Sequence, residues 1–187
     1  EVGGVFTTAD DVLTFGVAGD IDFNVLGEFS TLATGNYANY RAVIYNTDPS
    51  IIYTDAALNS NPGIISPAGI TLSLNPPEHH LALTSAFQFS VQSPTQRLVL
   101  VDGPVSYICN TATGVLTRFQ GYAYQVVQPG IGMSGGNSGR ITSKVSACNI
   151  LYEAGSAQRG GLITIDLTLT SEGESVRLMH QVHVDNV

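Results

Sequence analysis

The sequence predicts a mainly β protein with antiparallel sheets and long loops. Only 12% of its 187 residues are charged, whereas 20 are Gly and eight are Pro. Two C-terminal segments, residues 162–170 and 176–184, alternate apolar and polar side chains with the period of a strand. Residues 97–124 predict three consecutive strands with two tight connections. Together these observations favour sheets built from neighbouring segments of a single domain, because the chain is long enough for one sizeable core.

The N-terminal half contains fewer clear strands. We expect strands over residues 11–17, 40–45 and 70–74, and a short strand or a turn over residues 22–26. Residues 31–39 predict a loop. Residues 50–78 are rich in Asn, Pro, Gly and Ser, so we expect no other regular element there beyond the strand at 70–74.

The central meander is expected to consist of strands over residues 98–101, 105–109 and 115–124. The polar connection at residues 110–114 ends in Gly, as a hairpin with a left-handed residue requires. A Gly-rich loop follows at residues 129–139. Residues 144–152 predict either a strand or a short helical turn.

The C-terminal pair gives the clearest pattern. Ile163, Ile165, Leu167 and Leu169 share one face of the first strand. In the second strand the shared face holds Val176, Leu178, His180, Val182 and Val184. Residues 171–175 are expected to join the two strands as a hairpin loop.

Charge and hydropathy exclude several classes of function. The net charge of −8, without clustered Lys or Arg, argues against binding nucleic acid and against docking on anionic lipid. The chain opens on Glu, and it has neither a signal peptide nor a run of 18 apolar residues. We therefore expect a processed or truncated product, and the low charge with many Gly and Pro residues suggests an extracytoplasmic protein.

Cys109 and Cys148 are the only cysteines. In a chain of this composition the pair predicts one structural disulfide, although two buried free thiols would fit the spacing as well. The sequence has no CxxC motif, and two cysteines alone do not make a Cys-rich zinc site.

Two serines lie in motifs that resemble those of hydrolases. Residues 132–136 (GMSGG) place Ser134 in a G-x-S-x-G pattern, but the GGNSGR that follows does not predict the helix that a nucleophile elbow needs. Ser138 lies in a GNSG sequence and follows His79 and Asp102 in the order of a protease triad. Because Asp102 precedes Gly-Pro in a predicted turn, it is poorly placed to hold an imidazole. We therefore expect no enzymatic activity.

The remaining candidates are possible metal ligands. His180 and His183 are three residues apart on a predicted strand and would point to opposite faces, and adjacent His79 and His80 would do the same. Calcium could be held by a group of four carboxylates, although their spacing does not match an EF-hand; these are Asp10, Asp11, Asp20 and Asp22. Solvated carboxylates and surface or half-buried histidines are the favoured interpretation, so we expect no metal and no cofactor.

Four segments in this order resemble the J-type minor pilins and pseudopilins. They are FQFSVQSPTQRLVLVDGPVSYIC, GVLTRFQGYA, KVSACNILYEAGSAQRGGLITIDLTL and VRLMHQVHVDNV, which together span residues 87–187. Within that family they are most similar to the minor pilin of the mannose-sensitive haemagglutinin (MSHA) type IV pilus. The first half of the chain agrees only loosely, chiefly at residues 43–46 (VIYN).

The resemblance implies an α+β pilin-like head whose N-terminal spine helix is absent from this chain. It also implies a non-enzymatic subunit at the periplasmic face of a Gram-negative inner membrane and in the pilus, where it joins other minor pilins. Such subunits take part in priming, assembling or capping a type IV pilus or a type II secretion pseudopilus. In that case the head alone is expected to be a monomer, and an apolar run of about 20 residues would precede Glu1 in the full-length protein.

The alternative is a free-standing secreted β domain that binds carbohydrate or a host surface. The sequence has no Trp and only 8% aromatic residues, which disfavours a sugar-stacking platform. An enzyme is the third interpretation.

Overall fold

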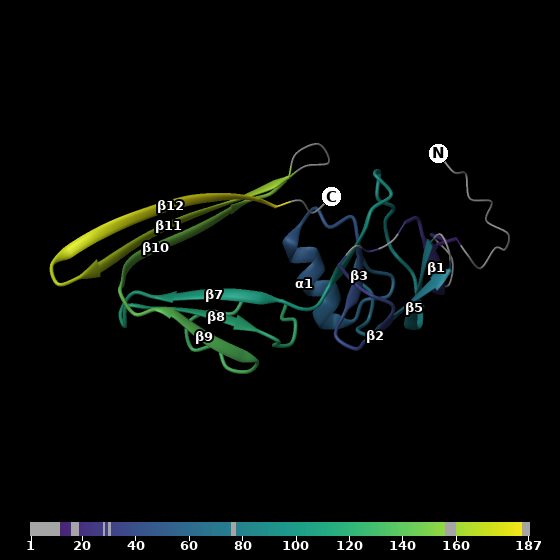
Figure 1. The fold of residues 1–187 in the computed structure, drawn as a ribbon, viewed down its shortest axis with the longest axis horizontal. Helices are drawn as coiled ribbons and strands as arrows, with labels where there is room; N and C mark the ends of the chain where they lie inside the picture. Colours follow the sequence, from purple (N-terminus) through teal and green to yellow (C-terminus); the bar gives the residue numbers. More distant parts are fainter. Residues whose placement is uncertain are drawn as a thin grey trace. The chain divides into compact units, whose positions relative to one another are not determined.

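A computed structural model describes residues 12–15, 19–27, 29, 31–75, 78–155 and 160–184 (Figure 1). These residues form one short α-helix and several antiparallel sheets, which confirms the mainly β prediction. By its internal contacts the chain divides into two compact units. Unit 1 comprises Glu1–Tyr45 and Thr54–Asp102, and unit 2 comprises Asn46–Tyr53 and Gly103–Val187. The expectation that both belong to one domain stays a prediction.

Unit 1 contains two antiparallel sheets. The four-stranded sheet has the order β1 (Asp20–Val25), β5 (Glu78–Phe87), β4 (Ile70–Asn75) and β2 (Gly35–Tyr37). The second sheet pairs β3 (Arg41–Ile44) with β6 (Leu98–Val101). The strands predicted at 40–45, 70–74 and 98–101 are confirmed, and the segment at 22–26 is part of a strand.

The core of unit 1 is built from alternate residues of these strands and from the aromatic end of β5. Its most buried large side chains include Phe23, Leu72, Leu81, Phe87 and Phe89, each at most 2% exposed. The rings of Phe87 and Phe89 meet edge to face with centroids 4.9 Å apart, a favoured aromatic geometry. Unit 1 therefore has a closed apolar core of its own.

The helix α1 (Pro49–Leu58) lies where the sequence predicted only loop. Its start has a recognisable cap: Asp48 Oδ1 accepts hydrogen bonds from the Ser50 backbone N–H at 2.8 Å and from its hydroxyl at 2.7 Å. Pro49 occupies the first helical position, which suits its fixed φ. Asn59 follows the helix with a φ of 51°, in the left-handed region that commonly ends a helix. These signals were present in the sequence, but the helix has no apolar stripe, so periodicity did not reveal it.

Unit 2 contains two three-stranded antiparallel sheets, which Figure 1 shows as separate ribbons. One joins β7 (Val105–Asn110), β8 (Val115–Gln120) and β9 (Asn137–Thr142). The other joins β10 (Val145–Glu153), β11 (Gly161–Ser171) and β12 (Glu174–Val184). Residues 144–152 thus form a strand, and the helical alternative for them is wrong.

The β11–β12 hairpin confirms the predicted C-terminal pair. Its register places Leu167 opposite Leu178 and Leu169 opposite Val176, so the two predicted apolar faces are one face of the sheet. Only Glu172 and Gly173 lie between the strands, with φ values of 53° and 86°. Two positive φ angles are what a type I′ turn needs, and the connection is therefore tighter than the five-residue loop that the sequence suggested.

Three strand predictions need correction. The strand at 98–101 pairs with β3 in unit 1 rather than with β7, because Gly103, at φ 133°, and Pro104 lead the chain away instead of turning it back. The strand predicted at 115–124 ends at Gln120, and β9 occupies the end of the predicted Gly-rich loop. Within the segment predicted at 11–17, residues 12–15 are not in a strand, while residues 11, 16 and 17 lie outside the described part of the chain.

Candidate functional site

The two serine motifs lie on exposed backbone. Ser134 is in the connection before β9, and no helix follows it, whereas a nucleophile elbow places its Ser between a strand and a helix. Ser138 is exposed in β9 itself and lies opposite Phe119 of β8. Sequence reasoning placed Ser134 correctly in a loop, but it missed that Ser138 belongs to a strand.

His79 is a buried structural residue in unit 1. His79 is only 4% exposed. Its Nδ1 accepts a hydrogen bond from the Phe29 backbone N–H at 2.9 Å, and its ring stacks on the Phe29 ring with centroids 5.9 Å apart. A triad histidine instead donates from Nδ1–H to a carboxylate. The hydrogen bond and the stacking therefore attach the segment after β1 to β5. Asp102, the candidate aspartate of the triad, is an exposed residue directly after β6.

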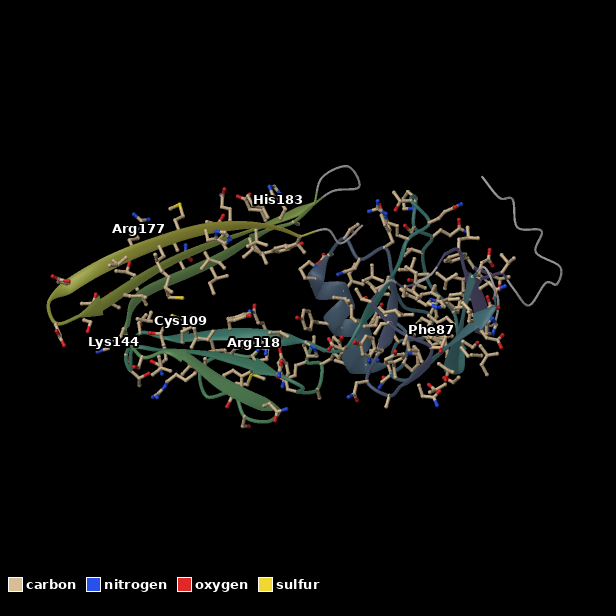
Figure 2. All side chains as sticks on the ribbon, in the orientation of Figure 1. Phe87, Cys109, Arg118, Lys144, Arg177 and His183 are labelled. Carbon is tan, nitrogen blue, oxygen red and sulfur yellow. The ribbon has the colours of Figure 1, made fainter. Side chains whose placement is uncertain are left out.

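The other histidines each have their own surroundings on β5 or β12. His80 Nδ1 is 2.9 Å from Asn24 Oδ1, and its Nε2 is 3.6 Å from Asp22 Oδ2. His180 pairs with Ile165 and His183 with Leu162, so alternation puts the two imidazoles on opposite faces, as the sequence predicted. Figure 2 shows His183 on the same side of this sheet as Arg177.

Asp20 and Asp22, the described carboxylates of the candidate calcium group, have local partners. Asp20 accepts hydrogen bonds from the Thr14 backbone N–H at 2.5 Å and from its hydroxyl at 2.8 Å. Asp10 and Asp11 lie outside the described residues. Within the described ranges, no group of three or more His, Cys, Asp or Glu is arranged to hold a metal ion.

Cys109 of β7 and Cys148 of β10 bring the two sheets of unit 2 together. Burial raises the pKa of the Cys109 thiol to about 12, helped by a hydrogen bond and a charge interaction with the Cys148 side chain. No disulfide joins the two thiols in this structure, and the predicted disulfide stays a prediction. Their interaction nevertheless shows that the face of the β7–β8–β9 sheet with Cys109 is turned toward the face of the β10–β11–β12 sheet with Cys148.

The β10–β11–β12 sheet has an apolar face that is only partly covered. We call the following residues the apolar face: Cys148, Ile150, Tyr152, Ile163, Ile165, Leu167, Leu169, Val176, Leu178, His180, Val182 and Val184. Leu178 is 49% exposed and Val176 57% exposed, although both point to the same side as Cys148. Contiguous apolar surface of this kind commonly marks a protein–protein contact.

The opposite face of this sheet is polar. Arg177 donates from Nε to Asp166 Oδ1 at 2.9 Å and from its NH2 group to Oδ2 at 2.6 Å, in a bidentate pair. The Arg177 guanidinium holds the pKa of the Asp166 carboxyl below its usual value, mainly through its hydrogen bonds to the carboxylate and to a lesser degree through its charge. In β11 and β12 the polar side chains thus lie mainly on this face and the apolar ones on the other, as the alternating sequence of these two strands predicted.

A tyrosine cluster in unit 2 was missed from the sequence. Tyr122 is 8% exposed, and its hydroxyl lies 2.6 Å from the buried Ser106 Oγ. Tyr53 packs near Tyr124 with ring centroids 5.9 Å apart, and burial, followed by the Tyr122 charge, raises the Tyr53 pKa. Because Tyr53 is distant in the chain from Tyr122 and Tyr124, no local pattern predicted the cluster.

Unit 1 contains an open cleft of about 810 Å³. Apolar side chains dominate its lining, among them Leu13, Phe15, Phe23 and Leu98, and Ser93 and Gln92 add polar groups. Its lining therefore offers mostly apolar contacts, with polar side chains that also include Asn24, Gln96 and Arg97.

Comparisons of the chain with models of known protein families, with curated proteins and with solved structures gave no match. Among the described helical residues, no segment is long and apolar enough to cross a membrane.

Proposed function

We propose that this chain is the head of a J-type minor pilin-like subunit, similar to that of the MSHA pilus. In this role it takes part, without catalysis, in priming, assembling or capping a type IV pilus or a type II secretion pseudopilus. The resemblance of residues 87–187 supports the proposal, because its four segments contribute strands to both sheets of unit 2.

The observation that carries the proposal is the partly exposed apolar face. Leu178 and Val182 are 49% and 40% exposed on the face of β12 opposite to Arg177 and Gln181. Covering such side chains stabilises a complex by about 25 cal/mol per Å² of apolar area, before the cost of association. A subunit whose apolar side chains are covered by neighbouring subunits in an assembly would have such a face.

The partners are other minor pilin heads of the same system, at the periplasmic face of the inner membrane and in the pilus tip. The net charge of −8 opposes self-association at low salt, so the isolated head is a monomer. Without contributions from apolar spine helices, we expect micromolar affinity between heads, about −8 kcal/mol.

The test measures binding of the head to candidate partner heads by sedimentation and titration calorimetry. Leu178→Glu places a charge on the apolar face and is expected to weaken binding about tenfold or more, which corresponds to about 1.4 kcal/mol. His183→Glu is the matched control, because His183 is exposed on the polar face of the same strand and lies opposite Leu162 rather than a charged residue. Equal effects of both substitutions, or a stable homodimer without binding to any pilin head, would contradict the proposal.

The second candidate function is that of a secreted binding module, and the cleft in unit 1 is the observation that favours it. A small apolar ligand that stabilises the chain and contacts Phe15 and Phe23, in the absence of any pilin binding, would support this function instead. Thermal-shift screening followed by Phe15→Ala would make that distinction.

A further inference from the structure

The charges of the chain are distributed unevenly along its sequence. Residues 103–152 contain Arg118, Arg140 and Lys144 but no Asp or Glu. All 15 acidic residues of the chain lie outside this segment, together with only four of its seven basic residues. The acid-free segment folds into β7, β8, β9 and most of β10, so one sheet of a strongly acidic protein is locally basic.

The three basic residues surround the edge strand β9. Arg140 is exposed within β9, and Lys144 is exposed two residues after its end. Arg118 lies on β8 opposite Gly139, where a Cβ would meet no atom within 4 Å. Because Arg140 is the next residue along β9, Arg118 and Arg140 lie on opposite faces of the sheet and place a guanidinium on each side of the edge.

These cations have no carboxylate partner among the described residues. The ion pairs there are His80–Asp22 and Arg177–Asp166, and the hydrogen-bond partner of the Arg118 guanidinium is the Gln120 side chain. Their charge is therefore not neutralised by the described part of the chain.

The backbone of β9 also has an unused side. Within the described ranges β9 pairs only with β8, which leaves the outer row of N–H and C=O groups without a neighbouring strand. Such an edge accepts an added strand from a partner. Ile141, 53% exposed in β9, offers an aliphatic contact beside the cations.

The positive charges of Arg118, Arg140 and Lys144 determine which kind of strand can pair with the β9 edge. A second copy of β9 would bring Arg140 and Lys144 of both chains together, and like charges across a strand pair are destabilising. Carboxylates on an incoming strand would instead form charge-assisted hydrogen bonds with these groups. We propose that the β9 edge binds an extended acidic segment of a partner protein, which adds to the sheet as an antiparallel fourth strand. That the partner is another pilin subunit rests on the proposed function, whereas the chemistry of the edge does not.

The experiment uses the full chain and a fluorescent peptide that alternates Val and Glu over the length of β9. Anisotropy is expected to show binding that weakens as salt is raised, because the charged contacts are exposed. The R118Q/R140Q/K144Q variant should bind the peptide at least about tenfold more weakly. Arg177→Gln is the matched control and should bind normally, because Arg177 lies on the other sheet and is paired with Asp166.

A backbone-methylated version of the peptide separates strand addition from simple charge attraction. It keeps the carboxylates but loses the N–H groups, and it should not bind. Equal binding of the methylated peptide, or equal binding by the triple variant, would overturn the proposal. So would tight binding of phosphatidylglycerol vesicles through the same three cations with no peptide binding, which would assign the edge to lipid. Peptide binding without binding to any pilin head would leave the edge site standing and remove the proposed function.

Discussion

The predicted disulfide between Cys109 and Cys148 can be tested by its effect on stability. In the chain-entropy model, a cross-link closing a loop of about 40 residues stabilises the fold by about 4 kcal/mol. This is a substantial part of the roughly 5–15 kcal/mol by which a typical domain is stable. The structure supplies the required proximity, because the two side chains already interact across β7 and β10.

The assay is urea unfolding of the oxidised protein with and without reductant, followed by circular dichroism. The midpoint should fall on reduction by an amount equivalent to about 4 kcal/mol. A protein with both cysteines replaced by Ser is the control and should not respond to reductant. Two thiols labelled in denatured, unreduced protein that was prepared under oxidising conditions would refute the disulfide.

The pKa of Cys109 adds a second expectation for the reduced protein. Its value in the folded state, about 12, lies above the ordinary 9.0, so the thiol is protonated in both folded and unfolded chains below pH 9. Between these two values the unfolded chain loses this proton and the folded chain keeps it. The reduced protein should therefore lose stability as the pH rises above about 9, and alkylation of Cys109 should remain slow up to that pH. Rapid alkylation of Cys109 at neutral pH would contradict the raised pKa of this half-buried thiol.

Three further predictions concern the core, the serines and the surface ion pair. Phe87→Ala should reduce the free energy of unfolding by about 3–5 kcal/mol, because it leaves a cavity beside the core of unit 1, and urea titration measures this; a loss below about 1 kcal/mol would contradict the packing. Ser134→Ala and Ser138→Ala should each change stability by no more than about 0.5 kcal/mol, and a fluorophosphonate probe should label neither serine; covalent labelling would refute the non-enzymatic assignment. Arg177→Gln should return the lowered pKa of Asp166 toward its ordinary value in an NMR titration. Since the folded value is depressed, the contribution of this pair to stability is present above the ordinary carboxyl pKa and is lost as the pH falls through the folded value; an unchanged titration would show that the pair does not form in solution.

Local sequence patterns predicted the elements whose neighbours in space are also neighbours in the chain. The β11–β12 hairpin could be predicted because strict alternation specifies the faces of both strands, although the two-residue turn at Glu172 and Gly173 is shorter than the predicted loop. In contrast, β6 pairs with β3, which lies far away in the sequence, and only a tertiary contact decides that pairing. The helix α1 was missed because its stability does not depend on one apolar stripe, although its Asp-Pro-Ser start was a usable signal.

The candidate site shows the same limit. Opposite orientations for His180 and His183 followed from strand alternation alone. The structural role of His79 could not be predicted, because its hydrogen-bond donor, Phe29, is 50 positions away in the chain. The edge strand β9 could not be predicted either, because its small and polar residues are typical of a loop. They form a strand only through their hydrogen-bonded pairing with β8.

The division of α1 between the two units has a consequence for the order in which the chain folds. Asn46–Tyr53 belongs to unit 2, but it leaves the ribosome before Thr54–Asp102, which completes unit 1. Unit 1 can therefore close during synthesis, whereas Tyr53 must wait until Tyr124 has been made before the two rings pack. A fragment beginning at Gly103 would lack Tyr53 permanently. Separate expression of the C-terminal sheets should thus expose the ring of Tyr124, and a soluble version of unit 2 needs residues 46–53 grafted back onto it.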